Sequence, residues 1–114
     1  MSVSSRWEHC PDGTALEYVE HSSDPAALYQ GVILVASALG VPARFYRAYA
    51  NFMAMKGFTV LSFNYRGIGL SGQQADPGLI RLAHWGSQDL DTMIGKATKI
   101  AGSSPVYLVG HSIG

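Results

Sequence analysis

The chain has 114 residues, and its eight Lys plus Arg balance eight Asp plus Glu, so the formal net charge is zero. Nucleic acids and anionic membranes bind clustered Lys and Arg, and this balance therefore argues against a nucleic-acid partner. Hydrophobic residues make up 47% of the chain and charged residues only 14%, which excludes intrinsic disorder and predicts a buried core.

The sequence also allows a prediction of where in the cell the protein is found. The longest apolar run, residues 31–41, is too short to span a bilayer, and the first residues lack the charged and apolar regions of a signal peptide. The single cysteine, Cys10, cannot form an internal disulfide and is expected to be a small buried side chain. We therefore expect a cytoplasmic protein without an integral membrane segment.

The N-terminal third predicts a hairpin followed by a buried strand. Short strands are expected at 6–10 and 15–20, because the Asp12-Gly13 pair between them supplies the backbone freedom of a tight turn. Residues 21–30 show no sustained hydrophobic period and are expected to form a surface connection. The continuous aliphatic run at 31–37 predicts a central parallel strand that is covered on both faces.

The middle of the chain predicts a helix and then another strand. Apolar side chains recur at helical spacing over 42–56, with Pro42 suited to the first turn and Gly57 to the position after the end. The aromatic side chains of this helix are expected to pack in the core; they are Tyr46, Tyr49 and Phe52. The β-branched and aromatic segment 58–65 predicts the next strand.

The last third repeats this alternation. Apolar positions from Leu82 to Ile100 mark one face of a second helix that Gly102 ends, and Asp89 and Asp91 are expected on its solvated face. The apolar segment 105–109 predicts a further strand. Strands that alternate with helices predict an α/β fold: a mostly parallel sheet with an N-terminal antiparallel hairpin and helices on both faces.

The chain ends in a motif with a known chemical use. Residues 110–114, Gly-His-Ser-Ile-Gly, match the Gly-x-Ser-x-Gly pattern directly after the last predicted strand. Gly110 and Gly114 are needed because the turn from strand to helix is so tight that side chains at these positions meet other backbone. This geometry exposes the hydroxyl of Ser112 above the sheet, which predicts a catalytic nucleophile.

With this motif the chain resembles the α/β-hydrolase superfamily of serine hydrolases, in particular its lysophospholipase-like and monoglyceride-lipase-like members. The resemblance extends to residues 37–40, Ser-Ala-Leu-Gly, where the family has His-Gly-x-Gly, and to residues 64–71, Asn-Tyr-Arg-Gly-Ile-Gly-Leu-Ser, where it has Asp-x-Arg-Gly-x-Gly-x-Ser. Ser37-Ala38 and Asn64 depart from the pattern. The resemblance implies a single α/β-hydrolase domain, of which residues 1–114 form a C-terminally incomplete part.

The resemblance also implies a mechanism. The backbone N–H groups of Leu39 and Ile113 would form the oxyanion hole, and in the family the catalytic acid and histidine follow the nucleophile, beyond residue 114. None of the histidines present is nominated as the base; they are His9, His21, His84 and His111. The 114-residue chain alone is therefore expected to be inactive.

One motif suggests a different class of protein. Residues 67–72 spell Gly-x-Gly-x-x-Gly after a strand, the fingerprint of a dinucleotide-binding turn. That fingerprint requires a helix at its last glycine, whereas residues 73–78 continue as a loop, so no cofactor is expected.

We therefore expect a serine hydrolase that cleaves a carboxylic ester or thioester through an acyl-enzyme on Ser112, with a small acyl compound as its substrate. The alternative is a non-catalytic module that keeps the fold and lacks the acid and histidine.

Overall fold

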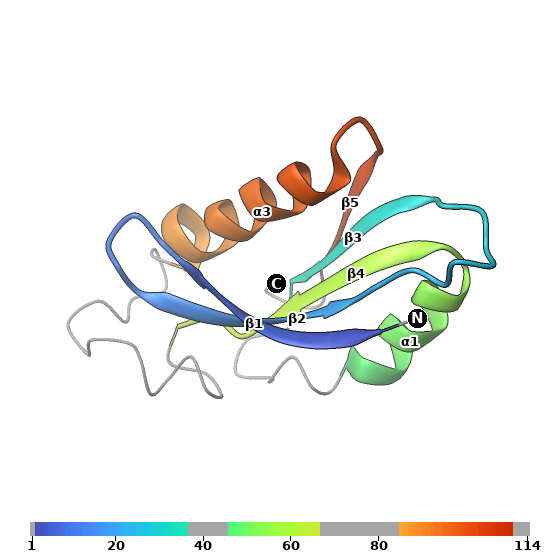
Figure 1. Ribbon diagram of the computed structural model, residues 1–114. Helices are drawn as coiled ribbons and strands as arrows, with labels where there is room; N and C mark the ends of the chain where they lie inside the picture. Colours follow the sequence, from blue (N-terminus) through green and yellow to red (C-terminus); the bar gives the residue numbers. More distant parts are fainter. Residues whose placement is uncertain (1, 37–45, 67–84, 111–114) are drawn as a thin grey trace.

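The structure is a computed structural model that describes residues 2–36, 46–66 and 85–110 (Figure 1). A single mixed sheet has the strand order β1-β2-β4-β3-β5. Its strands are β1 (Val3–His9), β2 (Ala15–His21), β3 (Gly31–Ala36), β4 (Phe58–Phe63) and β5 (Val106–Gly110). The helices of the described residues are α1 (Arg47–Met55), the π-helical turn η4 (Trp85–Leu90) and α3 (Asp91–Ala101), which continues η4.

The N-terminal hairpin forms as predicted, and its first strand begins earlier than expected. Strands β1 and β2 pair antiparallel over their whole length. In the turn between them, Gly13 has a φ of 89° and donates its N–H to the carbonyl of Cys10, while the N–H of Cys10 bonds to the carbonyl of Thr14. Gly13 thus adopts a backbone conformation that other residues rarely reach.

The buried aliphatic run forms the central parallel strand that its composition predicts. Strand β3 lies between β4 and β5 and pairs parallel with both, and all six of its residues are buried. Strand β2 joins this parallel part through an antiparallel pairing with β4. The predicted α/β class, with an antiparallel hairpin added to parallel strands, is confirmed.

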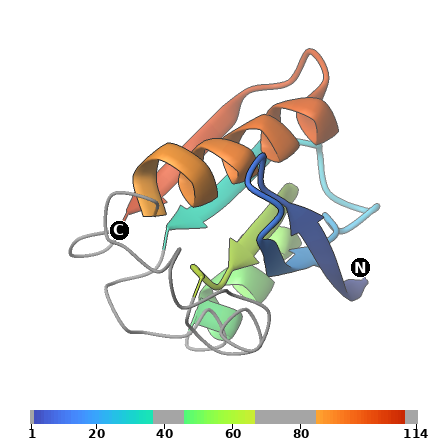
Figure 2. The same cartoon turned by 90° about the vertical axis from the view of Figure 1, so that its left-hand side faces the viewer.

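Helices cover both faces of the sheet (Figure 2). Helix α3 packs on one face, where Met93 and Ala97 join a cluster with Leu34 and Phe63. Helix α1 packs on the other face, where Ala50 contacts a cluster that includes Ile33. Neighbouring residues of the central strands therefore contribute alternately to the two clusters, as the pleat requires.

The face of α1 that meets the sheet is not the one the aromatic pattern predicts. The buried residues of α1 are Ala50 and Ala54, whereas Tyr49 is partly exposed and Phe52 is 57% exposed. Small alanine side chains let the helix backbone approach the sheet closely, and Phe52 instead packs under the ammonium of Lys56, 5.3 Å from its ring centre. The expectation that Tyr49 and Phe52 lie in the core is wrong.

The surface connection expected at 21–30 begins one residue later than predicted. His21 is the last residue of β2 and is buried. Further along, Gln30 donates its N–H to the carbonyl of Gly57, which follows α1 with a φ of 103°. A Cβ atom at Gly57 would lie only 2.0 Å from the carbonyl oxygen of Leu28. The predicted glycine after the first helix is therefore needed both for its conformation and for this close approach.

Candidate active site

Strands β3 and β5 end side by side at one edge of the sheet. Ala36, the last residue of β3, lies opposite Gly110, the last residue of β5. Because the two strands are parallel, the segments that follow them leave the sheet from neighbouring positions. The strand predicted before the Ser112 motif is thus confirmed, and its neighbour is the strand that precedes Leu39.

The site residues themselves fall mainly outside the described part of the chain. Gly110 is described as the exposed end of β5. The other nominated residues lie outside the described residues, and their roles stay predictions; they are Leu39, Ser112, Ile113 and Gly114. The same holds for the glycines of the 67–72 motif.

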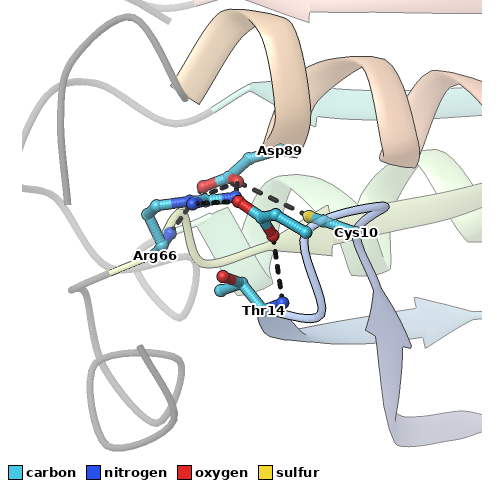
Figure 3. A network of polar contacts seen from close by, with 5 residues as sticks. Cys10, Thr14, Arg66 and Asp89 are labelled. Atoms are coloured by element: carbon cyan, nitrogen blue, oxygen red, sulfur yellow. Dashed lines mark hydrogen bonds and ion pairs between the residues drawn. The ribbon is translucent and has the colours of Figure 1, made fainter. Parts of the chain in front are cut away.

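At the end of the neighbouring strand β4, a fully buried arginine is bound by two carboxylates (Figure 3). Nε of Arg66 donates to Oδ1 of Asp89 at 2.7 Å, and NH2 lies 2.7 Å from the same oxygen. NH1 donates to Oδ2 of Asp12, also at 2.7 Å. Charge-assisted bonds of this length are among the strongest in proteins, so Arg66 connects η4 and the hairpin turn to the end of β4.

Asp89 fixes the main chain as well as the side chain of Arg66. Its Oδ2 accepts the backbone N–H of Arg66 at 2.8 Å, and its Oδ1 lies 3.6 Å from the thiol of Cys10. The expectation that Asp89 belongs to a solvated helix face is therefore wrong, because its carboxylate is fully buried in an ion pair. Asp91, two residues later, is exposed as expected.

Asp12 is the more accessible of the two carboxylates. Its Oδ1 accepts the backbone N–H of Thr14 at 3.0 Å, an arrangement typical of an Asx turn. The hydrogen bond from Arg66 lowers the pKa of Asp12 to about 2, so this side chain stays ionised at neutral pH. Asp12 therefore both stabilises the predicted turn and binds Arg66, and the turn pattern alone did not indicate the second role.

Two side chains near the ion pairs of Arg66, those of Cys10 and Tyr65, are held in their neutral forms. Burial raises the pKa of the Cys10 thiol, which keeps it protonated and a poor nucleophile. Burial also raises the pKa of Tyr65 to about 12. Neither side chain is therefore a candidate for catalysis, and Cys10 is the small buried residue that the sequence predicts.

Asn64, one of the departures from the family pattern, has a partner in this structure. Its Nδ2 donates to Oε1 of Glu17 on β2 at 2.8 Å, while Oε2 of Glu17 accepts from Ser5 at 3.2 Å. An aspartate at position 64 would bring two carboxylates into contact, whereas the amide supplies the donor that Glu17 needs. Asparagine at position 64, rather than the aspartate of the family pattern, therefore suits the presence of Glu17 on β2.

Comparisons with known proteins agree with this architecture. Residues 27–114 match the hydrolase family described as serine aminopeptidase, S33. The chain belongs to this family of α/β hydrolases. A search of curated proteins finds no match.

Solved α/β-hydrolase structures superpose on the whole chain at low sequence identity. A soluble variant of monoglyceride lipase from Saccharomyces cerevisiae has a TM-score of 0.82 at 21% identity, with 100% of this chain and 38% of the lipase covered. A carboxyl esterase from Bacillus coagulans gives 0.77 at 18% identity, with 100% and 37% covered. A serine hydrolase without lid from Xanthomonas campestris gives 0.75 at 18% identity, with 100% and 52% covered.

The chain therefore has the α/β-hydrolase fold and spans between 37% and 52% of these three relatives. Within the described residues, no cluster of three or more His, Cys, Asp or Glu side chains could hold a metal ion. No helix among the described residues has the length and apolar character needed to cross a bilayer.

Proposed function

We propose that this α/β hydrolase is a serine hydrolase that cleaves a carboxylic ester or thioester through an acyl-enzyme on Ser112. The observation that carries the proposal is the pairing of Ala36 with Gly110. The strands that precede Leu39 and Ser112 thus end beside each other, and this supports the proposal because a nucleophile and its oxyanion hole must lie close together.

The proposed reaction has two halves. The Oγ of Ser112 attacks the carbonyl carbon and loses its proton to a base, and the resulting tetrahedral oxyanion accepts hydrogen bonds from the N–H groups of Leu39 and Ile113. The oxyanion collapses, the bond to the alcohol or thiol breaks, and the base returns the proton to the leaving group. Water then releases the acyl group. Backbone donors serve with any side chain, so Leu and Ile are compatible with this role.

The base and its carboxylate partner are expected from the remainder of an α/β-hydrolase domain, since none of the histidines present is nominated. The ion pairs of Arg66 support the proposal indirectly, because they fix the end of β4, which pairs with β3, one of the two strands that precede the proposed site. We further propose a cytoplasmic location, with which a buried free thiol at Cys10 is compatible.

The test uses the intact protein with p-nitrophenyl acetate and an acyl thioester as substrates. We expect turnover that Ser112→Ala abolishes without a change in the unfolding midpoint, and a fluorophosphonate probe that labels Ser112. Turnover that survives Ser112→Ala, or labelling of another residue, would contradict the nucleophile assignment. An intact protein with no turnover and no labelling would favour the alternative, a non-catalytic module with this fold.

The substrate class can be separated in the same assay. The family description refers to aminopeptidases, whereas the structural neighbours include an esterase and a lipase. We expect the p-nitrophenyl ester to be cleaved with a higher kcat/KM than an aminoacyl p-nitroanilide. The opposite order would assign the protein to peptide substrates while leaving the role of Ser112 intact.

A further inference from the structure

Strand β2 ends in a histidine that is buried on the face covered by α1. His21 is 2% exposed and lies opposite Val60, which belongs to the cluster under α1. Neither ring nitrogen has a hydrogen-bond partner among the described residues. A neutral imidazole leaves one N–H unpaired here, whereas a protonated ring would leave two and add a buried charge.

The neighbours of His21 make protonation still less favourable. From α1, the positive charge of Arg47 in the first turn acts on the ring. From β1 and β4, the residues opposite His21 are Val3 and Val60, which carry no charge. Among the described residues, the ionisable group whose charge acts on the ring is therefore another cation, Arg47.

Two carboxylates near His21 in the chain are engaged elsewhere. Glu17, on the same face of β2, accepts hydrogen bonds from Ser5 and Asn64. Asp24, in the connection after β2, accepts the backbone N–H of Ala26 at 2.9 Å. In the described structure neither carboxylate hydrogen-bonds to the ring of His21. A proton on the ring would therefore have no carboxylate partner there.

We propose that His21 is a proton-sensitive contact between β2 and α1, and that uptake of a proton by its ring releases α1 from the sheet. Burial, and then the charge of Arg47, lower the pKa of His21 below its ordinary value of 6.5. The ring is therefore neutral in the packed state and takes up a proton when α1 opens. Opening becomes more favourable as the pH falls below 6.5.

The position of this contact gives it a functional consequence. Helix α1 begins at Arg47, eight residues after Leu39 in the chain, so release of α1 would act close in sequence to the proposed oxyanion hole. An acidic pH would then disturb the hydrolytic site by a route separate from protonation of a catalytic base. The contact itself does not depend on the proposed chemistry, and Ser112→Ala should leave it unchanged.

Amide hydrogen exchange of the intact protein tests the proposal. Opening constants for the amides at 50–54 in α1, corrected for intrinsic exchange rates, are measured between pH 7.5 and pH 5. For a ring that titrates at about 6.5 only when α1 is open, we expect the opening constant to rise by up to about 30-fold. His21→Gln, which cannot titrate, should abolish this rise.

Two further variants serve as controls. Arg47→Gln removes the neighbouring charge from an exposed position and should reduce the rise without abolishing it, which keeps the test valid if His21→Gln fails to fold. His9→Gln, at an exposed histidine of β1, should leave the rise unchanged. The proposal is overturned if the wild-type opening constant is independent of pH, if His21→Gln responds like the wild type, or if α3 opens with the same pH dependence as α1.

Discussion

Asp89 binds Arg66 with both of its carboxylate oxygens, one on the guanidinium and one on the backbone N–H. The two residues stand 23 positions apart, so this contact joins the end of β4 to the π-helical turn before α3. Both side chains are fully buried. Removing one partner of a buried ion pair leaves the other charge without compensation, and that cost is much larger than the net contribution of the pair.

We therefore predict that Asp89→Asn destabilises the intact protein by about 3 kcal/mol, since among the described residues Arg66 would then keep a single carboxylate partner, Asp12. Urea unfolding measures this change. The matched control is Asp91→Asn, at an exposed position two residues away, which should change the free energy of unfolding by less than about 0.5 kcal/mol. Equal effects of the two variants would show that the Arg66 network contributes little to stability.

Asp12 should make the protein sensitive to acid. Its hydrogen bond from Arg66 lowers its pKa to about 2, below the value of about 3.9 in an unfolded chain. The stabilisation is therefore complete above pH 4 and is lost as the pH falls toward 2. In urea unfolding between pH 5 and pH 2, Asp12→Asn should be less stable than the wild type at pH 5, and the difference should shrink in acid. A difference that stays constant with pH would contradict this assignment.

Glycine substitutions should have opposite effects at two positions. Gly57→Ala forces a side chain into a positive φ and into contact with the carbonyl of Leu28, and should destabilise the protein by more than about 1 kcal/mol. Gly95→Ala, inside α3 with no atom within 4 Å of the added Cβ, should stabilise it by about 0.5–1 kcal/mol. Thermal unfolding of both variants checks the pair, and a stable Gly57→Ala protein would rule out the close approach.

Local patterns in the sequence were sufficient to predict most of the fold. The aliphatic run of β3, the Asp12-Gly13 turn and Gly57 after α1 each reflect a requirement of the residues themselves or of their immediate neighbours. The face of α1 was less predictable, because its packing is decided by what the sheet accommodates. Ala50 and Ala54 permit close contact, whereas the larger Phe52, which hydrophobicity alone would place inside, lies outside.

The polar contacts near the site depend on tertiary structure. Asp89 looks like an ordinary helix-surface residue until Arg66 is placed beside it, and no spacing rule connects the two positions. His21 was missed for a similar reason, since it is buried at a position of β2 that pairs with both β1 and β4, and these pairings are not local in sequence. The Gly-x-Ser-x-Gly pattern at 110–114 could be recognised from the sequence because the pattern itself is local, but residues 111–114 lie outside the described residues and the role of Ser112 stays a prediction.

The outer edge of β5 gives a final prediction, for a polypeptide of residues 1–114 made by itself. Strand β5 pairs only with β3 among the described strands, and Tyr107 and Leu108 on its two faces are 49% and 51% exposed. An apolar strand edge of this kind pairs with other chains, so the polypeptide should self-associate in light scattering and show no esterase turnover. Leu108→Lys should reduce the association, whereas Ile94→Lys, on the exposed side of α3, should not. A monomeric polypeptide, or equal effects of the two lysines, would mean that the β5 edge does not drive association.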